Sequence, residues 1–278
     1  MQRIHWSGMT HPGRFRPNNE DAFLGLILNE QEVHYLGKEG DAPLQDSQFL
    51  FAVSDGMGGA NAGDFASRLT LQGLTKRLPL ALRKTDTRTP ELRQQVLRNI
   101  ILDIHEEVMA TGRWYEECKG MGATLSLCWI HPTEGFIIGH VGDSRIYQIP
   151  NGETIIQRSE DHSEVGRLYR EGKINERESK NHPERHLLDQ SIGGLRREVD
   201  PQIAHFSMQP GDHLILCSDG ICDGLYDRSI ESTLLRPTPN IKDLRPSERL
   251  VREALFSSGR DNLTSMVVWF TQEMGEAS

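Results

Sequence analysis

The chain has 278 residues, of which 36% are hydrophobic and 26% are charged, a composition typical of a folded protein with a sizeable core. Its formal net charge of −9, with no basic cluster, argues against a general nucleic-acid or anionic-membrane binder. No apolar run approaches the roughly 20 residues of a membrane span, and MQRIHWSGMTHPG lacks the apolar core of a signal peptide, so we expect a cytoplasmic protein.

Two apolar runs in the first quarter of the chain predict strands. They are AFLGLIL (22–28) and QFLFAVS (48–54), each followed by polar or glycine-rich sequence. The polar segment between them, 29–47, is typical of a solvated hairpin or loop.

Two amphipathic helices are predicted next. The first has apolar residues at helical spacing and is expected to end at Pro79: Ala62, Phe65, Ala66, Leu69, Leu74 and Leu78. The second begins near Pro90, a favourable first-turn residue. Its apolar face is Leu92, Val96, Ile100, Ile104 and Val108.

A strand-rich stretch follows, and its short links favour antiparallel hairpins. The runs ATLSLCWI, GFIIGHVGD, RIYQIP and ETIIQRS are joined by links such as HPTE and NGE. Parallel crossovers would need a dozen or more residues. After Asp161 the sequence becomes strongly polar, and we predict an exposed, partly helical flap at about residues 163–190.

The last third of the chain predicts three strands and one helix. The strands are PQIAHFSMQ, DHLILCSDG and TSMVVWFT. The helix, PSERLVREALFSSG, is expected to have Ser247 as its cap and Gly259 as its stop.

This order of elements predicts one α+β domain spanning residues 1–278. We expect a four-layer α-β-β-α sandwich of two mainly antiparallel sheets flanked by helices. A parallel doubly wound sheet fits less well, because strands and helices do not alternate along the chain.

Aspartates recur at the ends of apolar runs. Asp55 and Asp219 each follow a strand and precede glycine, Asp143 follows IIGHVG, and Asp261 precedes the last strand. Each could simply form a turn, since Asp-Gly is a common turn pair. A carboxylate at the end of a buried strand is unfavourable unless it is paired or bound to metal, however, and few basic residues lie nearby. With the acidic pair Glu20-Asp21, the recurrence favours convergence on a cation.

The ligand type indicates the metal. Carboxylates without an organised set of His or Cys suit hard ions such as Mg²⁺ or Mn²⁺. Two such ions about 4 Å apart can polarise a phosphate and activate a bridging water. Arg16, in RPNNED just upstream of the acidic pair, has the guanidinium fork that binds phosphate.

Eight motifs, in order, resemble those of the PP2C-type (PPM) metal-dependent protein serine/threonine phosphatases. They are RPNNEDA, FAVSDGMGG, MGATL, VGDSRIY, DHS, SIGG, PGDHLILCSDGICDGL and RDNLTSMVV. The resemblance runs from about Gly8 to Phe270 and is to a bacterial-type member. It implies two Mn²⁺ or Mg²⁺ ions and a third, weaker site.

The resemblance also implies roles for individual residues. Asp55 would bridge both metals, the Gly56 carbonyl would bind one, and Asp219 and Asp261 would complete the first site. The remaining roles fall to these residues: Glu20 and Asp21 at the second metal, Asp143 with Asp219 at the third, Arg16 on the phosphate and Asn262 behind Asp261.

One position departs from part of the family. Where some members have a histidine proposed as general acid, two residues after the bridging aspartate, this chain has Met57. His162, in EDHS, is the nearest motif histidine, and we expect a supporting structural role rather than direct catalysis.

The predicted activity is hydrolysis of phosphoserine and phosphothreonine in proteins by a metal-activated water at a dinuclear centre, without a covalent phosphoenzyme. The alternatives are a catalytically silent regulatory binding module and a phosphatase for small phosphoesters. Expected partners are phosphorylated substrates of a serine/threonine kinase, acted on by a monomer. The flap, lying between two site motifs, is expected to set substrate choice.

Other motifs give weaker indications of function. GMGGANAG matches neither the GxGxxG dinucleotide motif nor a phosphate loop ending in Gly-Lys-Ser/Thr, so no cofactor besides metal is expected. His182 and His186 have the spacing of a helical zinc pair, but Pro183 and the lack of a third ligand favour solvent-exposed histidines. The four cysteines form no CxxC pair, and we expect reduced, mostly buried thiols: Cys118, Cys128, Cys217 and Cys222.

Overall fold

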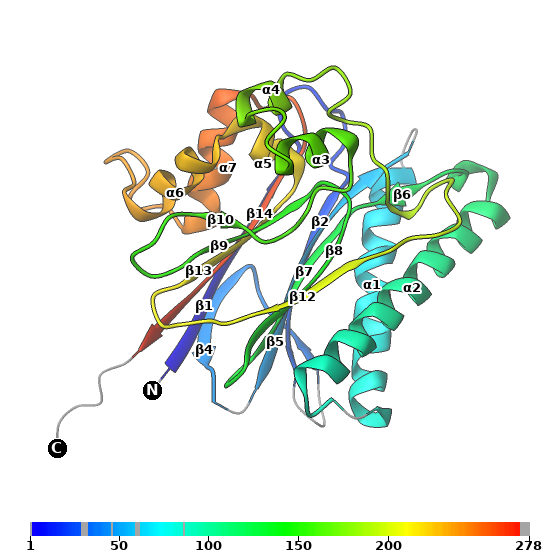
Figure 1. The fold of residues 1–278 in the computed structure, drawn as a ribbon, viewed down its shortest axis with the longest axis horizontal. Coiled ribbons are helices and arrows are strands. Elements are labelled where there is room, and N and C mark those ends of the chain that lie inside the picture. The colour runs from blue at the N-terminus through cyan, green and yellow to red at the C-terminus, as the bar shows by residue number, and fades with distance from the viewer. Residues whose placement is uncertain (1, 29–32, 46, 59–61, 86, 273–278) are drawn as a thin grey trace.

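The computed structural model describes residues 2–28, 33–45, 47–58, 62–85 and 87–272. Within them, two antiparallel sheets pack face to face, and helices cover the outer face of each sheet (Figure 1). The predicted α-β-β-α sandwich is therefore confirmed.

The first sheet has six strands in the order β10-β9-β13-β14-β1-β4. Their bounds are Gln2–His11 (β1), Glu39–Pro43 (β4), Arg145–Ile149 (β9), Ile156–Gln157 (β10), His213–Cys217 (β13) and Leu263–Gln272 (β14). Strand β1 was not predicted, since QRIHWSGMTH has no continuous apolar run. This strand forms through ten cross-strand pairs with β14 at the far end of the chain.

The second sheet has eight strands, six of them in the order β11-β6-β5-β7-β8-β12, while β2 pairs with both β5 and β3. Their bounds are Asp21–Leu28 (β2), Val33–Tyr35 (β3), Gln48–Met57 (β5), Gly122–Ala123 (β6), Leu125–His131 (β7), Gly135–Val141 (β8), Ile192–Gly193 (β11) and Gln202–Phe206 (β12). The segment expected as a solvated hairpin or loop contains β3 and β4, which join different sheets; its residues 29–32 and 46 lie outside the described chain.

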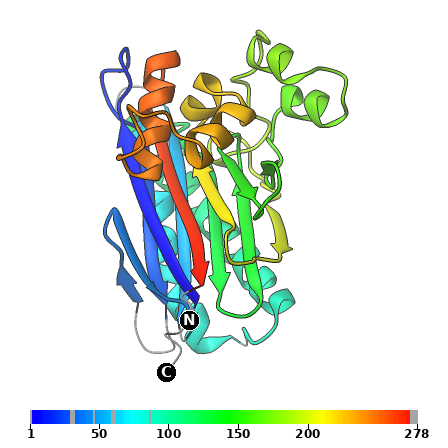
Figure 2. The same ribbon diagram turned by 90° about the vertical axis from the view of Figure 1, so that its left-hand side faces the viewer.

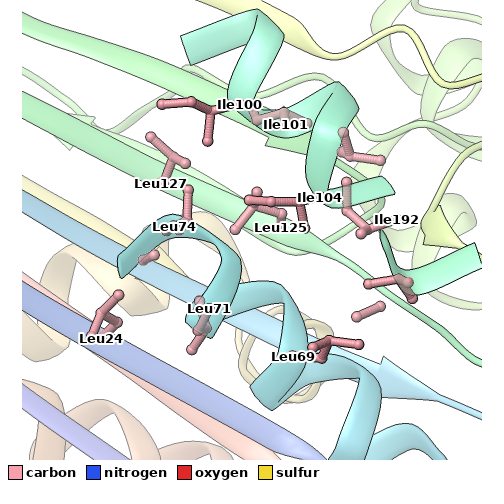
Figure 3. Close-up of a cluster of buried hydrophobic side chains, with 14 of the residues drawn as sticks. Leu24, Leu69, Leu71, Leu74, Ile100, Ile101, Ile104, Leu125, Leu127 and Ile192 are labelled. Carbon is pink, nitrogen blue, oxygen red and sulfur yellow. The ribbon is translucent and has the colours of Figure 1, made fainter. Parts of the chain in front are cut away.

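Two long helices, α1 (Ala62–Lys84) and α2 (Pro90–Trp114), pack on the eight-stranded sheet. Figure 3 shows Leu74 of α1 and Ile104 of α2 among the buried side chains over Leu125 and Leu127 of β7. The two helices bury the apolar outer face of this sheet.

Two expectations for α1 are wrong. The helix continues through Pro79 to Lys84, because Ala81 and Leu82 beyond the proline still pack on the core and offset the lost backbone hydrogen bond. Phe65, assigned to the buried face, is 44% exposed.

Three helices pack on the six-stranded sheet: α5 (Asp219–Gly224), α6 (Asp227–Leu235) and α7 (Pro246–Ser257). The strand predicted over DHLILCSDG stops at Cys217, and α5 begins at Asp219. Neither α5 nor α6 was predicted.

For α7 the N-terminal cap is Arg245, with Pro246 in the first turn, and not Ser247 as predicted. Gly259 is confirmed as the stop, with a φ of 62° and an N–H that donates to the Ala254 carbonyl.

The segment predicted to be a partly helical flap contains two short helices, α3 (Glu164–Arg170) and α4 (Glu176–Lys180). In Figure 2 it projects, in green, from one end of the sandwich. A short 3-10 helix, η1 (Glu116–Cys118), follows α2. No helix in the described part of the chain combines the length and apolar character needed to cross a membrane.

Candidate metal centre

Carboxylates from five segments meet at one end of the two sheets. Asp21 begins β2 and Asp55 lies near the end of β5, and the antiparallel register makes them direct partners. Asp143 follows β8, Asp219 opens α5 after β13, and Asp261 precedes β14. Strand ends on the same side of the sandwich thus bring together residues far apart in sequence.

A cleft of about 910 Å³ opens at this end of the sandwich. Every residue predicted to bind metal or phosphate lines it except Asp21: Arg16, Glu20, Asp55, Gly56, Asp143, Asp219 and Asp261. Asp21 is 6% exposed and lies across from Asp55.

The carboxylates are crowded and poorly solvated. Burial, followed by repulsion from Asp21 and Asp219, raises the pKa of Asp55 well above its usual range. Burial and then Asp143 do the same to the pKa of Asp219. Burial raises the pKa of Asp21 to about 6, against the opposing hydrogen bond from Ser218, and raises the pKa of Asp143 to about 7. A nearby positive charge would stabilise the ionised forms.

Two oxygens in the cluster lack a partner among the described residues. Asp21 Oδ1 and Asp219 Oδ1 are buried and accept no hydrogen bond. A buried polar atom without a partner is uncommon and indicates a missing ligand or water. Because the atoms offered are hard carboxylate oxygens, the cluster fits Mg²⁺ or Mn²⁺ rather than a soft ion.

Arg16 forms an ion pair with one of the predicted ligands. It is exposed, and its Nη2 lies 2.7 Å from Asp261 Oδ2. The hydrogen bond to Asp261 raises the pKa of Arg16, with further contributions from Asp219 and Glu20. Its guanidinium is therefore at the mouth of the cleft, within the field of the carboxylates.

Asn262 fixes the loop that carries Arg16 and Glu20. Its side-chain Oδ1 accepts from the Glu20 N–H at 2.8 Å, and its Nδ2 donates to the carbonyls of Pro12 and Asn18, each at 2.9 Å. The predicted support of Asp261 comes only from the Asn262 backbone N–H, which donates to Asp261 Oδ1. The side chain thus acts on Glu20.

Gly56 is required by backbone packing. A Cβ at this position would lie 1.9 Å from the Gly63 carbonyl oxygen and 2.9 Å from that of Glu20. The glycine therefore lets β5, the start of α1 and the Glu20 loop come together beside Asp55. Residues 59–61 of the same glycine-rich motif lie outside the described chain.

His162 lies beneath the site rather than in it. Its backbone N–H donates to the Gly142 carbonyl at 2.7 Å, and its Nδ1 accepts from the Gly142 N–H at 3.3 Å. Its carbonyl accepts from Asp189 of the flap. His162 therefore ties the flap to the turn before Asp143, while Met57, which has no proton to donate, lines the cleft.

Two residues outside the predicted set lie beside Asp219. His186 is solvent-exposed, as expected, but its Nδ1 lies 4.0 Å from Asp219 Oδ2. Ligand atoms of His186, Asp219 and Asp223 all lie within 4.8 Å of one another, whereas His182 is not in this group. Asp223 is four residues after Asp219, so recognising α5 would have placed it on the same helix face.

Comparisons with known families, sequences and structures all match protein phosphatases. A family model described as "Protein phosphatase 2C" matches residues 41–255. The chain is 30% identical over 267 residues to the serine/threonine phosphatase stp of Listeria monocytogenes, covering 95% of each chain. It also resembles the crystal structure of the Mycobacterium tuberculosis serine/threonine phosphatase PstP/Ppp, with a TM-score of 0.76, 28% identity and coverage of 97% of this chain and 100% of that one. A structure of the PstP catalytic domain in complex with 2 manganese ions has a TM-score of 0.74 at 26% identity, covering 98% and 100%.

Proposed function

Because the chain belongs to the protein phosphatase 2C family and is a serine/threonine phosphatase of that type, we propose that it hydrolyses phosphoserine and phosphothreonine in proteins at a dinuclear Mn²⁺ or Mg²⁺ centre. The observation that supports the centre is the cluster of carboxylates with two buried, unpartnered oxygens. Bound cations would supply an activated water and polarise the phosphoryl oxygens.

The chain's own residues would divide the binding of the cations. Asp55 would bind both, the Gly56 carbonyl and the carboxylates of Asp219 and Asp261 would hold the first, and Glu20 would hold the second. Asp21 would support the second from its buried place opposite Asp55. Asp143 with Asp219 would hold the third, weaker ion.

Arg16 holds the substrate phosphate. Its ion pair with Asp261 keeps the guanidinium at the mouth of the cleft. With Asp261 engaged by a cation, the Arg16 fork would be able to bind two phosphoryl oxygens. Because Met57 offers no proton, the leaving alkoxide receives its proton from another group.

The flap selects the substrate. Its residues from Arg185 to Gln190 line the cleft, and Leu187 among them is 63% exposed. An exposed apolar side chain beside the phosphate site is suited to contact the residues that flank a phosphorylated serine or threonine. A silent binding module is disfavoured, since buried carboxylates without a cation destabilise the fold.

Turnover on a panel of phosphoserine, phosphothreonine and phosphotyrosine peptides tests the proposal, with Mn²⁺ and with EDTA. We expect release of phosphate from the first two classes, its loss in EDTA, and a loss of about 100-fold or more in Asp219→Asn. Asp103→Asn, an exposed aspartate on α2, is the matched control. Wild-type turnover by Asp219→Asn, or activity unaffected by EDTA, would contradict the proposal.

A further inference from the structure

Two cysteines lie on either side of Asp219. Cys217 ends β13 and Cys222 lies in α5, and their Sγ atoms are 3.5 Å apart. Both are free thiols, 0% and 5% exposed. The contact brackets the four residues from Ser218 to Ile221, which include the predicted metal ligand.

We propose that Cys217 and Cys222 form an oxidisable dithiol, a modification site at which a hydroperoxide produces a disulfide that displaces Asp219. The disulfide itself does not depend on the proposed function, whereas its effect on metal binding does. The two parts can therefore be tested separately.

A small cavity gives an oxidant access to Cys222. It has a volume of about 40 Å³ and is lined by Cys222 together with Asp219 and Asp223. The same two aspartates also line the main cleft, so the cavity adjoins it. One water needs about 10–15 Å³ of such space, so a hydrogen peroxide molecule fits.

Polar side chains surround Cys222 and the cavity. Lys180 Nζ donates to the Cys222 carbonyl. Tyr147 Oη lies 3.7 Å from Cys222 Sγ and accepts a hydrogen bond from Arg145 at 3.1 Å. Lys180 and Arg145 both line the cavity with Cys222, so their N–H groups can hold a peroxide oxygen beside the sulfur.

The reaction balances with one equivalent of hydrogen peroxide. The Cys222 sulfur attacks the peroxide oxygen, the O–O bond breaks, and a sulfenic acid and water form. The Cys217 sulfur then attacks the Cys222 sulfur, and the sulfenic oxygen leaves as a second water. Two thiols give up two electrons and two protons, and the peroxide is reduced; a dithiol reductant reverses the step by exchange.

Formation of this bond would move the turn that carries Asp219. A disulfide is about 2.05 Å long, so the sulfurs must approach by about 1.5 Å. Ser218, inside the closed loop, donates from Oγ to Asp21 Oδ2 at 2.7 Å and from its N–H to the Thr264 carbonyl at 3.0 Å. The shift therefore reaches Asp21 as well as Asp219, and weaker metal binding follows.

Peptide mapping of the full chain, treated with hydrogen peroxide and alkylated, tests the modification directly. Trypsin leaves both cysteines on one peptide, 198–228, which contains no internal Lys or Arg. We expect this peptide to become lighter by two hydrogen atoms and to resist alkylation, and dithiothreitol to restore it. Peptides carrying Cys118 and Cys128 should be alkylated as before. A 198–228 peptide that stays fully alkylatable would overturn the proposal.

Calorimetric Mn²⁺ titration then tests the consequence. Oxidised wild type should bind Mn²⁺ at least tenfold more weakly than reduced protein, and Cys222→Ser should resist the oxidant. Cys118→Ser, a buried cysteine of η1, is the matched control and should respond as wild type does. Equal loss of Mn²⁺ affinity in Cys222→Ser would show that oxidation acts elsewhere, whatever the phosphatase activity of the preparation.

Discussion

Asp21 and Asp55 lie directly opposite each other in the antiparallel pair of β2 and β5. Like charges at directly opposed positions destabilise a sheet, and here burial adds to the repulsion. The repulsion between these buried carboxylates destabilises the metal-free protein, and a bound cation would relieve it.

Asp21→Asn should stabilise the metal-free protein and weaken its response to metal. The amide keeps an acceptor for the Ser218 hydroxyl and removes one negative charge beside Asp55. In EDTA we expect a gain on the order of 1 kcal/mol in unfolding free energy, and with Mn²⁺ a smaller rise in melting temperature than wild type shows. Thermal unfolding in both conditions measures this. Asp103→Asn should change neither value, and a destabilised Asp21→Asn protein in EDTA would count against the account.

Stability of the metal-free protein should fall as pH rises from about 4 to about 7. Asp21 and Asp143 have folded-state pKa values raised to about 6 and about 7, so in this window the folded state binds more protons than the unfolded state. Their stabilisation is present below the unfolded pKa and is lost as pH passes the folded one. Mn²⁺ affinity should rise over the same window, because ligands must be deprotonated. Urea unfolding in EDTA measures this, and the midpoint should fall from pH 4 to 7. A midpoint that rises over this range would contradict the prediction.

Asn262→Ala should weaken Mn²⁺ binding by about 10- to 100-fold, the range for residues that orient ligands. The change leaves the Glu20 N–H and two carbonyls of the loop without partners. Calorimetric titration gives the affinity. Asn151→Ala is the matched control, since its amide also donates to a proline carbonyl, that of Pro210, and neither residue lines the cleft. Equal effects of the two substitutions would remove the role assigned to Asn262.

Arg16→Lys should lower kcat/KM for phosphopeptides by about 10- to 100-fold while Mn²⁺ affinity stays near that of wild type. Lysine keeps the charge but loses the fork that binds two phosphoryl oxygens. Arg236→Lys, another exposed arginine paired with a carboxylate, is the control. A parallel loss of Mn²⁺ affinity in Arg16→Lys would assign the residue to metal binding instead.

Leu187→Ala should change the ranking of phosphopeptides without changing Mn²⁺ affinity. Losing contact with a leucine side chain removes up to about 2 kcal/mol of binding free energy, which allows differences of up to about 30-fold between peptides. Leu80→Ala is the control, because Leu80 is similarly exposed on α1 and does not line the cleft. If Leu187→Ala alters metal affinity and peptide ranking alike, the flap is part of the metal site rather than a selector.

The sequence predicted the layers of the fold and most of the cleft, since strand-end aspartates and helical periodicity are local signals. Its failures have physical causes. The strand β1 forms through pairing with β14 and β4, and α1 passes Pro79 because packing beyond the proline outweighs the local signal. In both elements, tertiary contacts determine the secondary structure more than local propensity does.

The same holds for the site. Asp55 and Asp219 stand out locally because each follows an apolar run and precedes glycine. His186 carries no such signal, because only the folding of the flap brings it to within 4.0 Å of Asp219. Asp223 was missed because α5, a short helix containing two glycines, was not recognised. The side-chain role of Asn262, across 242 residues from Glu20, is likewise visible only in three dimensions.

The most direct measurement is a calorimetric titration of EDTA-treated protein with Mn²⁺, comparing wild type with Asp55→Asn. We expect saturable binding of two or more ions per wild-type chain, and loss of that binding in the variant, since Asp55 is the residue proposed to bind both ions. No saturable heat in wild type, or identical isotherms for the two proteins, would contradict a shared cation as the partner of these carboxylates.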